Sequence, residues 1–138
     1  MAGARQVVVA ALAYWAGIFA LGFVLGTART LWLEPRWGPL AAVAAELPVM
    51  LGASWWWAGD LRRRHQLPTR AAAWAMGALA FALLLASELA LAIMLAGGQA
   101  ADWLAGLHQP AGALGLAGQV LFALIPACRW RAGPTTPA

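Results

Sequence analysis

The stretch from residue 71 to residue 96 reads AAAWAMGALAFALLLASELALAIMLA, and its one charged residue is Glu88. A helix that crosses a lipid bilayer needs about 20 mostly apolar residues, and this run is long enough. Three more runs have the same character, at residues 7–28, 39–59 and 111–128. We therefore predict an all-α fold, a four-helix transmembrane bundle.

The composition favours lipid rather than water as the surroundings of the chain. Of its 138 residues, 63% are hydrophobic and only 10% are charged, whereas soluble domains carry about 25% charged residues. A soluble globule of this composition would expose large apolar patches, which soluble monomers avoid. We expect one membrane domain over residues 1–132 and a disordered tail at 133–138.

The arginines predict the orientation of the four spans, because arginine and lysine are enriched in cytoplasmic loops. All nine basic residues are arginine. With four spans, only Arg29 and Arg36 fall on one side, and the others share the opposite side: Arg5, Arg62, Arg63, Arg64, Arg70, Arg129 and Arg131. Both termini are therefore expected in the cytoplasm, with the chain a multi-pass protein of a bacterial inner membrane.

Most tryptophans lie near the expected ends of the spans, as in the aromatic belts of membrane proteins. Only Trp15 lies well inside a span. The first span could also be read as a cleaved signal peptide, with Gly26 and Ala28 at cleavage offsets. Its apolar run exceeds the core of about 7–15 residues that signal peptides carry, so we expect it to be retained.

Three of the spans carry one polar residue at the same expected depth. Glu46 lies eight residues after Gly38, Glu88 eight before Ala96 and Gln119 eight after Ala111, all at outer ends. Eight residues span about 12 Å along a helix. Arg29 ends the first span above them, and Glu34 and His108 start near the outer face. We predict a polar layer inside the bundle, below its outer surface.

This polar layer has two interpretations. Ionisable groups inside a membrane are costly and face a bundle interior or a water-filled cavity. We expect at least one of Glu46 and Glu88 to be protonated near neutral pH, or a cation such as Arg29 to compensate it. The layer either holds the bundle together by hydrogen bonds or binds a proton, a cation or a small ligand from outside.

Small residues recur at helical spacing and predict where helices approach closely. Gly22 and Gly26 form a GxxxG pair in the first span. Alanines 78, 82, 86 and 90 form a stripe in the third span, with Ala82 and Ala86 at its centre, and Gly115 lies between two other glycines in the fourth. We expect these residues to pack helices within the bundle.

One stretch resembles a known sequence pattern. Residues 19–57 read FALGFVLGTARTLWLEPRWGPLAAVAAELPVMLGASWWW. The elements GFxLGTxR, EPxxG and ELPVML are similar to those of a family of small uncharacterised bacterial membrane proteins with four helices. The resemblance covers just over a quarter of the chain. It implies a fold and no activity.

The sequence excludes several kinds of chemistry. Cys128 is the single cysteine, so neither an intrachain disulfide nor a CxxC redox motif can form. We find no motif for a phosphate loop, a nucleophile or a zinc site, and we expect no metal, no cofactor and no nucleic acid as ligand.

Three functions remain as hypotheses. The first is a non-enzymatic accessory or assembly partner of a membrane complex, bound to lipid and to other subunits or to further copies of itself. The second is a small proton- or cation-linked transporter or channel that uses Glu46 and Glu88. A membrane enzyme acting on lipid or quinone is the least favoured, since no catalytic motif is present.

Overall fold

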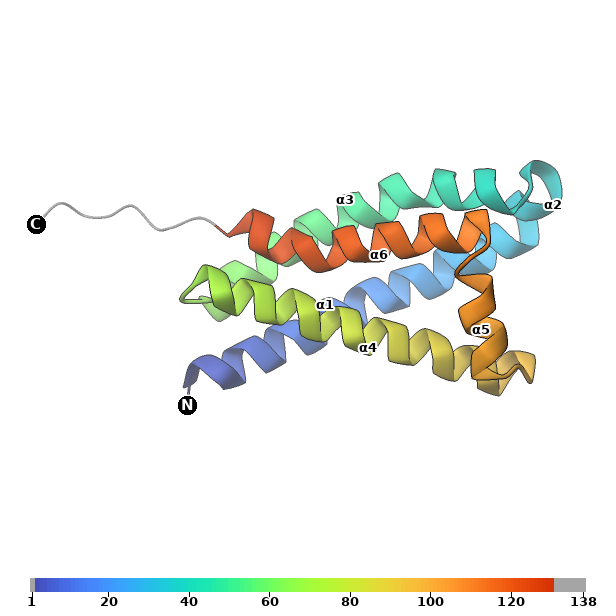
Figure 1. Cartoon of the computed structure of the whole chain (residues 1–138). Coiled ribbons are helices and arrows are strands. Elements are labelled where there is room, and N and C mark those ends of the chain that lie inside the picture. The colour runs from blue at the N-terminus through green and yellow to red at the C-terminus, as the bar shows by residue number, and fades with distance from the viewer. Residues whose placement is uncertain (1, 131–138) are drawn as a thin grey trace, which may run out of the picture.

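The computed structural model describes residues 2–130 and contains four long helices arranged as a bundle (Figure 1). They are α1 (Ala2–Ala28), α3 (Pro39–His65), α4 (Arg70–Ala96) and α6 (Pro110–Arg129). Each is long and apolar enough to cross a membrane, and no strand occurs among the described residues. The all-α prediction is confirmed, whereas the predicted disordered tail at 133–138 lies outside the described residues.

The first helix is longer than the predicted span. It continues beyond residue 28 through η1 (Arg29–Leu33), a π-helix, and then through α2 (Glu34–Trp37). Pro35 follows the π-helix in the first turn of α2, and its fixed φ suits a helical position. The chain turns only at Gly38, whose φ of 81° favours glycine, and Pro39 then begins α3.

Local signals end the other helices. Gln66 adopts the left-handed conformation and ends α3, and the Thr69 hydroxyl accepts a hydrogen bond from the Ala72 N–H at the start of α4. Gly97, with a φ of 62°, ends α4. A short helix that we did not predict, α5 (Ala100–Gly106), follows, because the Asp102 carboxylate accepts a hydrogen bond from the Gln99 N–H and caps it.

The bundle has two distinct ends (Figure 1). The start of α1, the link from α3 to α4 and the end of α6 lie together at what we call the terminal end. The opposite end carries α2 and α5, and we call it the α5 end. Both ends of the described chain therefore lie at the same end of the bundle, as an even number of long helices requires.

The helices pack as a closed ring of four. α1 packs against α3 and α4, and α6 packs against the same two helices. α3 and α4 therefore lie diagonally although they follow one another in the chain, and α1 and α6 form the other diagonal. The Tyr14 hydroxyl crosses this second diagonal and donates a hydrogen bond of 2.8 Å to the Phe122 carbonyl, with the two rings stacked 4.3 Å apart.

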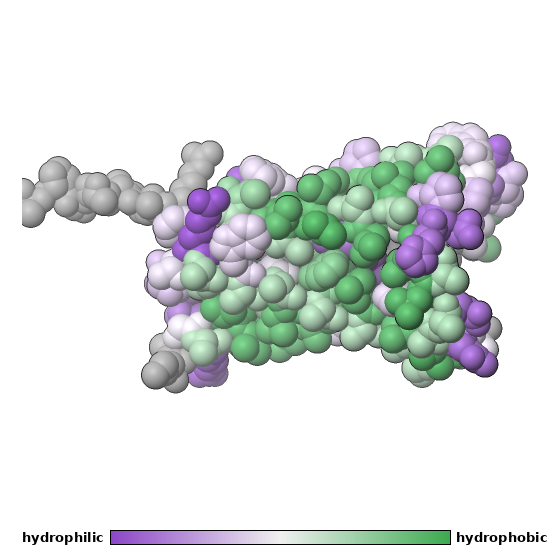
Figure 2. Space-filling view, in the orientation of Figure 1, coloured by the Kyte–Doolittle hydropathy of each residue, from purple (hydrophilic) through white to green (hydrophobic). Residues whose placement is uncertain are grey.

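The packed core fills the half of the bundle nearer the terminal end. Its buried residues include Tyr14, Leu61, Met76, Phe122 and Ile125. Outside, apolar side chains cover the middle of the molecule, and polar ones gather at its two ends (Figure 2). Large apolar side chains stay exposed around the middle, as expected of four helices that are long and apolar enough to cross a membrane.

The alanine stripe that we predicted to pack α4 against other helices lies on the exposed face of α4 instead. Ala78, Ala82, Ala86 and Ala90 are all exposed on the outside of the bundle. The buried face carries residues 73, 76, 77, 80 and 84 instead. Both sets satisfy helical spacing, and alanine is common on both, so spacing alone could not separate them.

Gly77 lies where α4 packs directly against α6. A Cβ at this position would overlap the backbone carbonyl of Ala123. The missing side chain therefore allows the two backbones to touch, which is the role that we expected of the alanine stripe.

Two half-buried tryptophans form hydrogen bonds between helices. The Trp57 indole N–H donates to the Ala13 carbonyl at 2.9 Å, and Gly17 leaves room for the ring. The Trp15 indole N–H donates to the Ser87 hydroxyl at 3.0 Å. Trp57 is thus half-buried and bonded to α1, whereas the belt prediction had treated it as an interfacial residue.

Candidate functional site

A cavity of about 500 Å³ lies between all four long helices, in the half of the bundle nearer the α5 end. Its deep part is apolar, with Ile18, Leu47, Met50, Leu84 and Phe122 among the lining residues. Phe122 is also part of the packed core, so the stacked pair of Tyr14 and Phe122 closes the cavity toward the terminal end.

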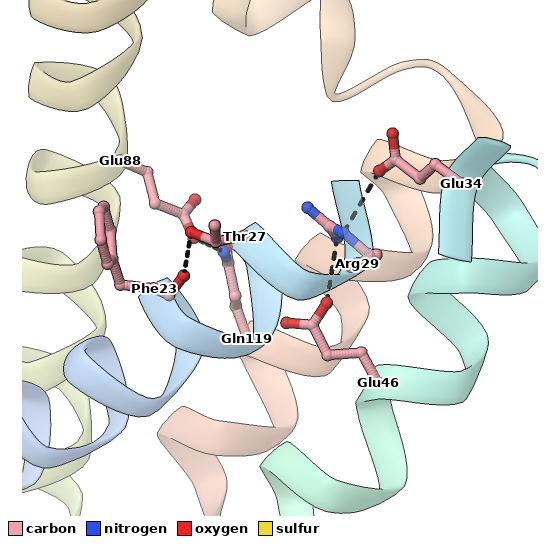
Figure 3. A network of polar contacts seen from close by, with 7 residues as sticks. All are labelled: Phe23, Thr27, Arg29, Glu34, Glu46, Glu88 and Gln119. Carbon is pink, nitrogen blue, oxygen red and sulfur yellow. Dashed lines mark hydrogen bonds and ion pairs between the residues drawn. The ribbon is translucent and has the colours of Figure 1, made fainter. Parts of the chain in front are cut away.

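The four residues predicted to form a polar layer all line this cavity: Arg29, Glu46, Glu88 and Gln119. They come from η1, α3, α4 and α6, and Figure 3 shows them converging from these four elements. The Gln119 amide donates a hydrogen bond of 2.5 Å to the Glu88 carboxylate. The structure thus brings together side chains that are up to 90 residues apart in the sequence.

Arg29 lies between two carboxylates (Figure 3). Its Nε atom is 3.3 Å from Glu34 Oε1, and its Nη1 atom is 3.4 Å from Glu46 Oε2. Arg29 begins the π-helix η1, whose wider turn joins the Glu34 N–H to the Arg29 carbonyl. Such segments are common at functional sites because they change the direction of side chains.

Of the two residues predicted near the outer face, Glu34 and His108, only one reaches the site. Glu34 joins the site through its ion pair with Arg29. His108 is exposed in the turn after α5 and lines neither described cavity, so the structure does not bring it to the site.

Some hydrogen-bonding atoms around the cavity have no partner among the described residues. The Thr27 and Ser54 hydroxyls donate to carbonyls of their own helices, at 2.8 and 2.7 Å. Gln119 Oε1 is buried and has no hydrogen-bond partner within residues 2–130. Glu88 has no cationic side chain within 4.0 Å in the same part of the chain. Glu46 Oε2 and Arg29 Nε are likewise buried without a hydrogen-bond partner in this part of the chain, so the site offers buried acceptors from Glu46 and Gln119 and one buried donor.

A second cavity of about 420 Å³ continues from the first toward the α5 end. It shares Arg29, Glu88 and Gln119 with the first cavity. Trp103 and Leu107, from α5 and the turn after it, line its outer side. The polar residues thus form a ring between an apolar inner chamber and an outer vestibule under α5.

Two glycines predicted to pack helices instead enlarge the cavity. A Cβ at Gly115 would meet no atom within 4 Å, and one at Gly26 would meet only Arg29 Nη2, at 3.9 Å. Both residues line the cavity. Gly22 does lie against a neighbouring helix, since its Cβ would be 3.1 Å from Met50 Cε. Gly26 and Gly115 therefore create space, whereas Gly22, Gly112 and Gly118 lie in close contact with their neighbours.

Sequence reasoning did not identify Phe122, Trp103 or Leu107 as part of the site. Phe122 follows the polar Gln119 by three residues, so helical spacing could have assigned it to the same face of α6. Trp103 and Leu107 could not be found in this way, because their position depends on how α5 folds back over the bundle.

No protein-family model, curated protein or solved structure matches the chain. The resemblance of residues 19–57 to a family of small bacterial membrane proteins therefore stays a prediction. What the site can do follows from its own groups: two carboxylates, an amide and a guanidinium at the mouth of an apolar chamber.

Proposed function

We propose that the chain is a non-enzymatic inner-membrane protein whose bundle binds a small amphipathic cation. The observation that carries this proposal is the cavity of about 500 Å³ lined by Arg29, Glu46, Glu88 and Gln119. Ligand pockets typically measure about 300–1,000 Å³, with apolar walls and a few convergent polar groups. This cavity fits that description.

The charge of the site supports a cationic ligand. Arg29 is shared by Glu34 and Glu46, which leaves these three side chains with one net negative charge if both acids are ionised. Glu88 adds a carboxylate that has only an amide donor, and Gln119 Oε1 is a further acceptor without a partner within residues 2–130. A ligand that brings donors and positive charge would satisfy both groups. A proton on Glu88 would compete with it.

The shape of the cavity supports an apolar body on the ligand. The chamber below the polar ring is lined by aliphatic side chains and by Phe19, Phe23 and Phe122. A ligand whose ammonium group lies at the polar ring would place its aromatic or aliphatic group in this chamber. Burial of that group would contribute about 25 cal/mol per Å² of apolar area.

Three probes with the same body and different charge test the proposal: 4-phenylbutylamine, 4-phenylbutanol and 4-phenylbutyrate. Equilibrium dialysis would compare purified protein in nanodiscs of zwitterionic lipid with empty nanodiscs at neutral pH. We expect the amine to bind at least tenfold more tightly than the carboxylate, with the alcohol between them. Equal binding of all three probes, or preference for the carboxylate, would overturn the cationic assignment.

The same proposal includes an orientation for the bundle. The arginine count supports a cytoplasmic terminal end and an external α5 end. Single cysteines test this in a Cys128→Ser background, with Arg63→Cys at the terminal end and His108→Cys at the α5 end. We expect an impermeant maleimide to label residue 108 in intact spheroplasts and residue 63 only after permeabilisation. The opposite pattern would reverse the orientation.

Proton- or cation-linked transport is the second candidate, and the position of Glu46 and Glu88 in one cavity favours it. Transport would require the Tyr14–Phe122 pair to separate, since it closes the cavity toward the terminal end. Uptake of 4-phenylbutylamine into proteoliposomes, driven by a proton gradient, tests this. Flux that is lost in folded Glu46→Gln or Glu88→Gln protein supports transport. Binding without flux in the wild type supports a binding role alone.

An accessory role in a larger membrane complex is compatible with the same site. The exposed alanines 78, 82, 86 and 90 of α4 would let a partner helix approach closely. Mild-detergent purification from native membranes, followed by mass spectrometry, would identify a stable partner. Loss of that partner in an Ala82→Leu variant, with the bundle still folded, would support this surface.

A further inference from the structure

A second group of charges, without ion-pair partners among residues 2–130, lies at the terminal end, far from the cavity. The guanidinium of Arg129, from the last turn of α6, lies 4.8 Å from the centre of the Trp55 ring of α3. It also lies directly against Gly59, where a Cβ would overlap the guanidinium. The missing side chain at Gly59 thus makes a place for this guanidinium on the surface of α3.

Arg62 belongs to the same face of α3. Residues 55, 59 and 62 follow one another by four and three positions, so they form one line along the helix. The Nε atoms of both Arg62 and Arg129 are buried and have no hydrogen-bond partner within residues 2–130. Two guanidinium groups therefore share one face without a described acceptor for these donors.

An acid of the same helix, Asp60, already pairs with other arginines. Asp60 pairs with Arg63 at 3.7 Å and with Arg64 at 2.7 Å. Asp60 precedes Arg62 by two residues, and residues at that spacing point to different sides of a helix. The contact of Arg129 with Trp55 orients the cation but does not neutralise it. The face of Arg62 and Arg129 thus keeps two positive charges.

We propose that Arg62 and Arg129, with Trp55 beside them, bind a phosphate ester, and that the ester is the headgroup of an anionic phospholipid. Arginine binds phosphate oxygens through two parallel hydrogen bonds, and two guanidinium groups can share one phosphate. A lipid is favoured over free phosphate because exposed tryptophan surface adjoins the site. Trp55 and Trp56 are 46% and 64% exposed, so an acyl chain would have an apolar surface to lie on.

Native mass spectrometry of the detergent-purified full chain tests the site. The protein would be titrated with phosphatidylglycerol or phosphatidylcholine, and retained lipid would be counted. We expect the wild type to retain phosphatidylglycerol preferentially, and Arg129→Gln to weaken this retention at least tenfold. Gly59→Ala should weaken it as well, because the added methyl group would displace the guanidinium.

Two matched variants control for general effects of charge and helix propensity. Arg63→Gln removes an arginine that pairs with Asp60, and Gly52→Ala adds a methyl group in open space. Both should retain phosphatidylglycerol as the wild type does. Wild-type retention in folded Arg129→Gln protein, or equal loss in Arg63→Gln, would overturn the site.

Two further measurements address the folding of the variant and the source of the phosphate. If Arg129→Gln does not fold, Arg129→Lys keeps the charge and should bind phosphatidylglycerol more weakly than the wild type, since it loses the planar fork. Inorganic phosphate should raise the melting temperature of the wild type much less than the lipid does. An equal shift by inorganic phosphate, without lipid retention, would overturn the assignment to a lipid headgroup.

Discussion

Glu88 is the carboxylate of the cavity that has no cation within 4.0 Å among residues 2–130. Glu88→Gln removes its charge and keeps its shape, so we expect the site to lose its preference for 4-phenylbutylamine over 4-phenylbutanol. A tenfold loss would correspond to about 1.4 kcal/mol. The dependence of amine binding on pH should flatten as well, because a proton no longer competes at this position.

Asp60→Asn is the matched control for Glu88→Gln. Asp60 lies on α3 near the terminal end and lines neither described cavity, and its substitution removes the same formal charge. Dialysis should find the affinity for the amine unchanged. Equal losses in the two variants would mean that the affinity reflects the overall charge of the protein rather than the site.

Arg29 is the subject of the second prediction at this scale, because its charge compensates the charges of Glu34 and Glu46 together. Its side chain is 28% exposed, so we expect Arg29→Gln to cost about 1–3 kcal/mol, less than removal of one partner from a fully buried pair. Thermal unfolding in detergent would measure the loss. The double variant Arg29→Gln/Glu46→Gln should recover part of it. A double variant that is no more stable than the single one would contradict this account of the pair.

At the scale of the elements, Gly17 permits the hydrogen bond between Trp57 of α3 and Ala13 of α1. A Cβ there would collide with the Trp57 indole, which donates to Ala13. We expect Gly17→Ala to lower the free energy of unfolding by about 1–3 kcal/mol, since a half-buried donor would lose its acceptor. Gly52→Ala, in open space, should leave stability equal or slightly raised. Similar effects of the two substitutions would exclude the proposed role of Trp57.

Gly115 on α6 tests whether the cavity is the place of binding. A side chain at this position would point into open space within both cavities, so Gly115→Leu should fold and fill part of the volume. We expect the amine affinity to fall at least tenfold while the melting temperature stays within a few degrees. Unchanged binding in a folded Gly115→Leu protein would mean that the amine binds elsewhere.

The elements also show why part of the site could be predicted and part could not. Glu46, Glu88 and Gln119 stand out because a polar residue in an apolar run is conspicuous, and rise per residue alone gave their common depth. The packing prediction for the alanine stripe was wrong because both faces of α4 are rich in small residues. Only the positions of the neighbouring helices determine which face is buried. Gly115 was predicted to pack helices and Gly59 was given no role, because the actual role of each depends on what lies opposite it.

At the scale of the whole molecule, the two halves of the bundle differ. The half nearer the terminal end is closely packed around Tyr14, Met76 and Phe122, whereas the half nearer the α5 end is hollow and polar. This asymmetry supports the proposed role, since the packed half closes the cavity toward the terminal end. The bundle as a whole would hold a ligand at the α5 end and a lipid headgroup at the terminal end.

A photoactivatable analogue of 4-phenylbutylamine, with a diazirine on its ring, tests the central claim most directly. After irradiation in nanodiscs, mass spectrometry would map the labelled residues. We predict labelling of cavity residues such as Phe23, Met50 and Phe122, removed by excess 4-phenylbutylamine but not by 4-phenylbutyrate. Labelling confined to the exposed alanines of α4, or labelling that neither compound removes, would contradict the account of the cavity as a binding site for amphipathic cations.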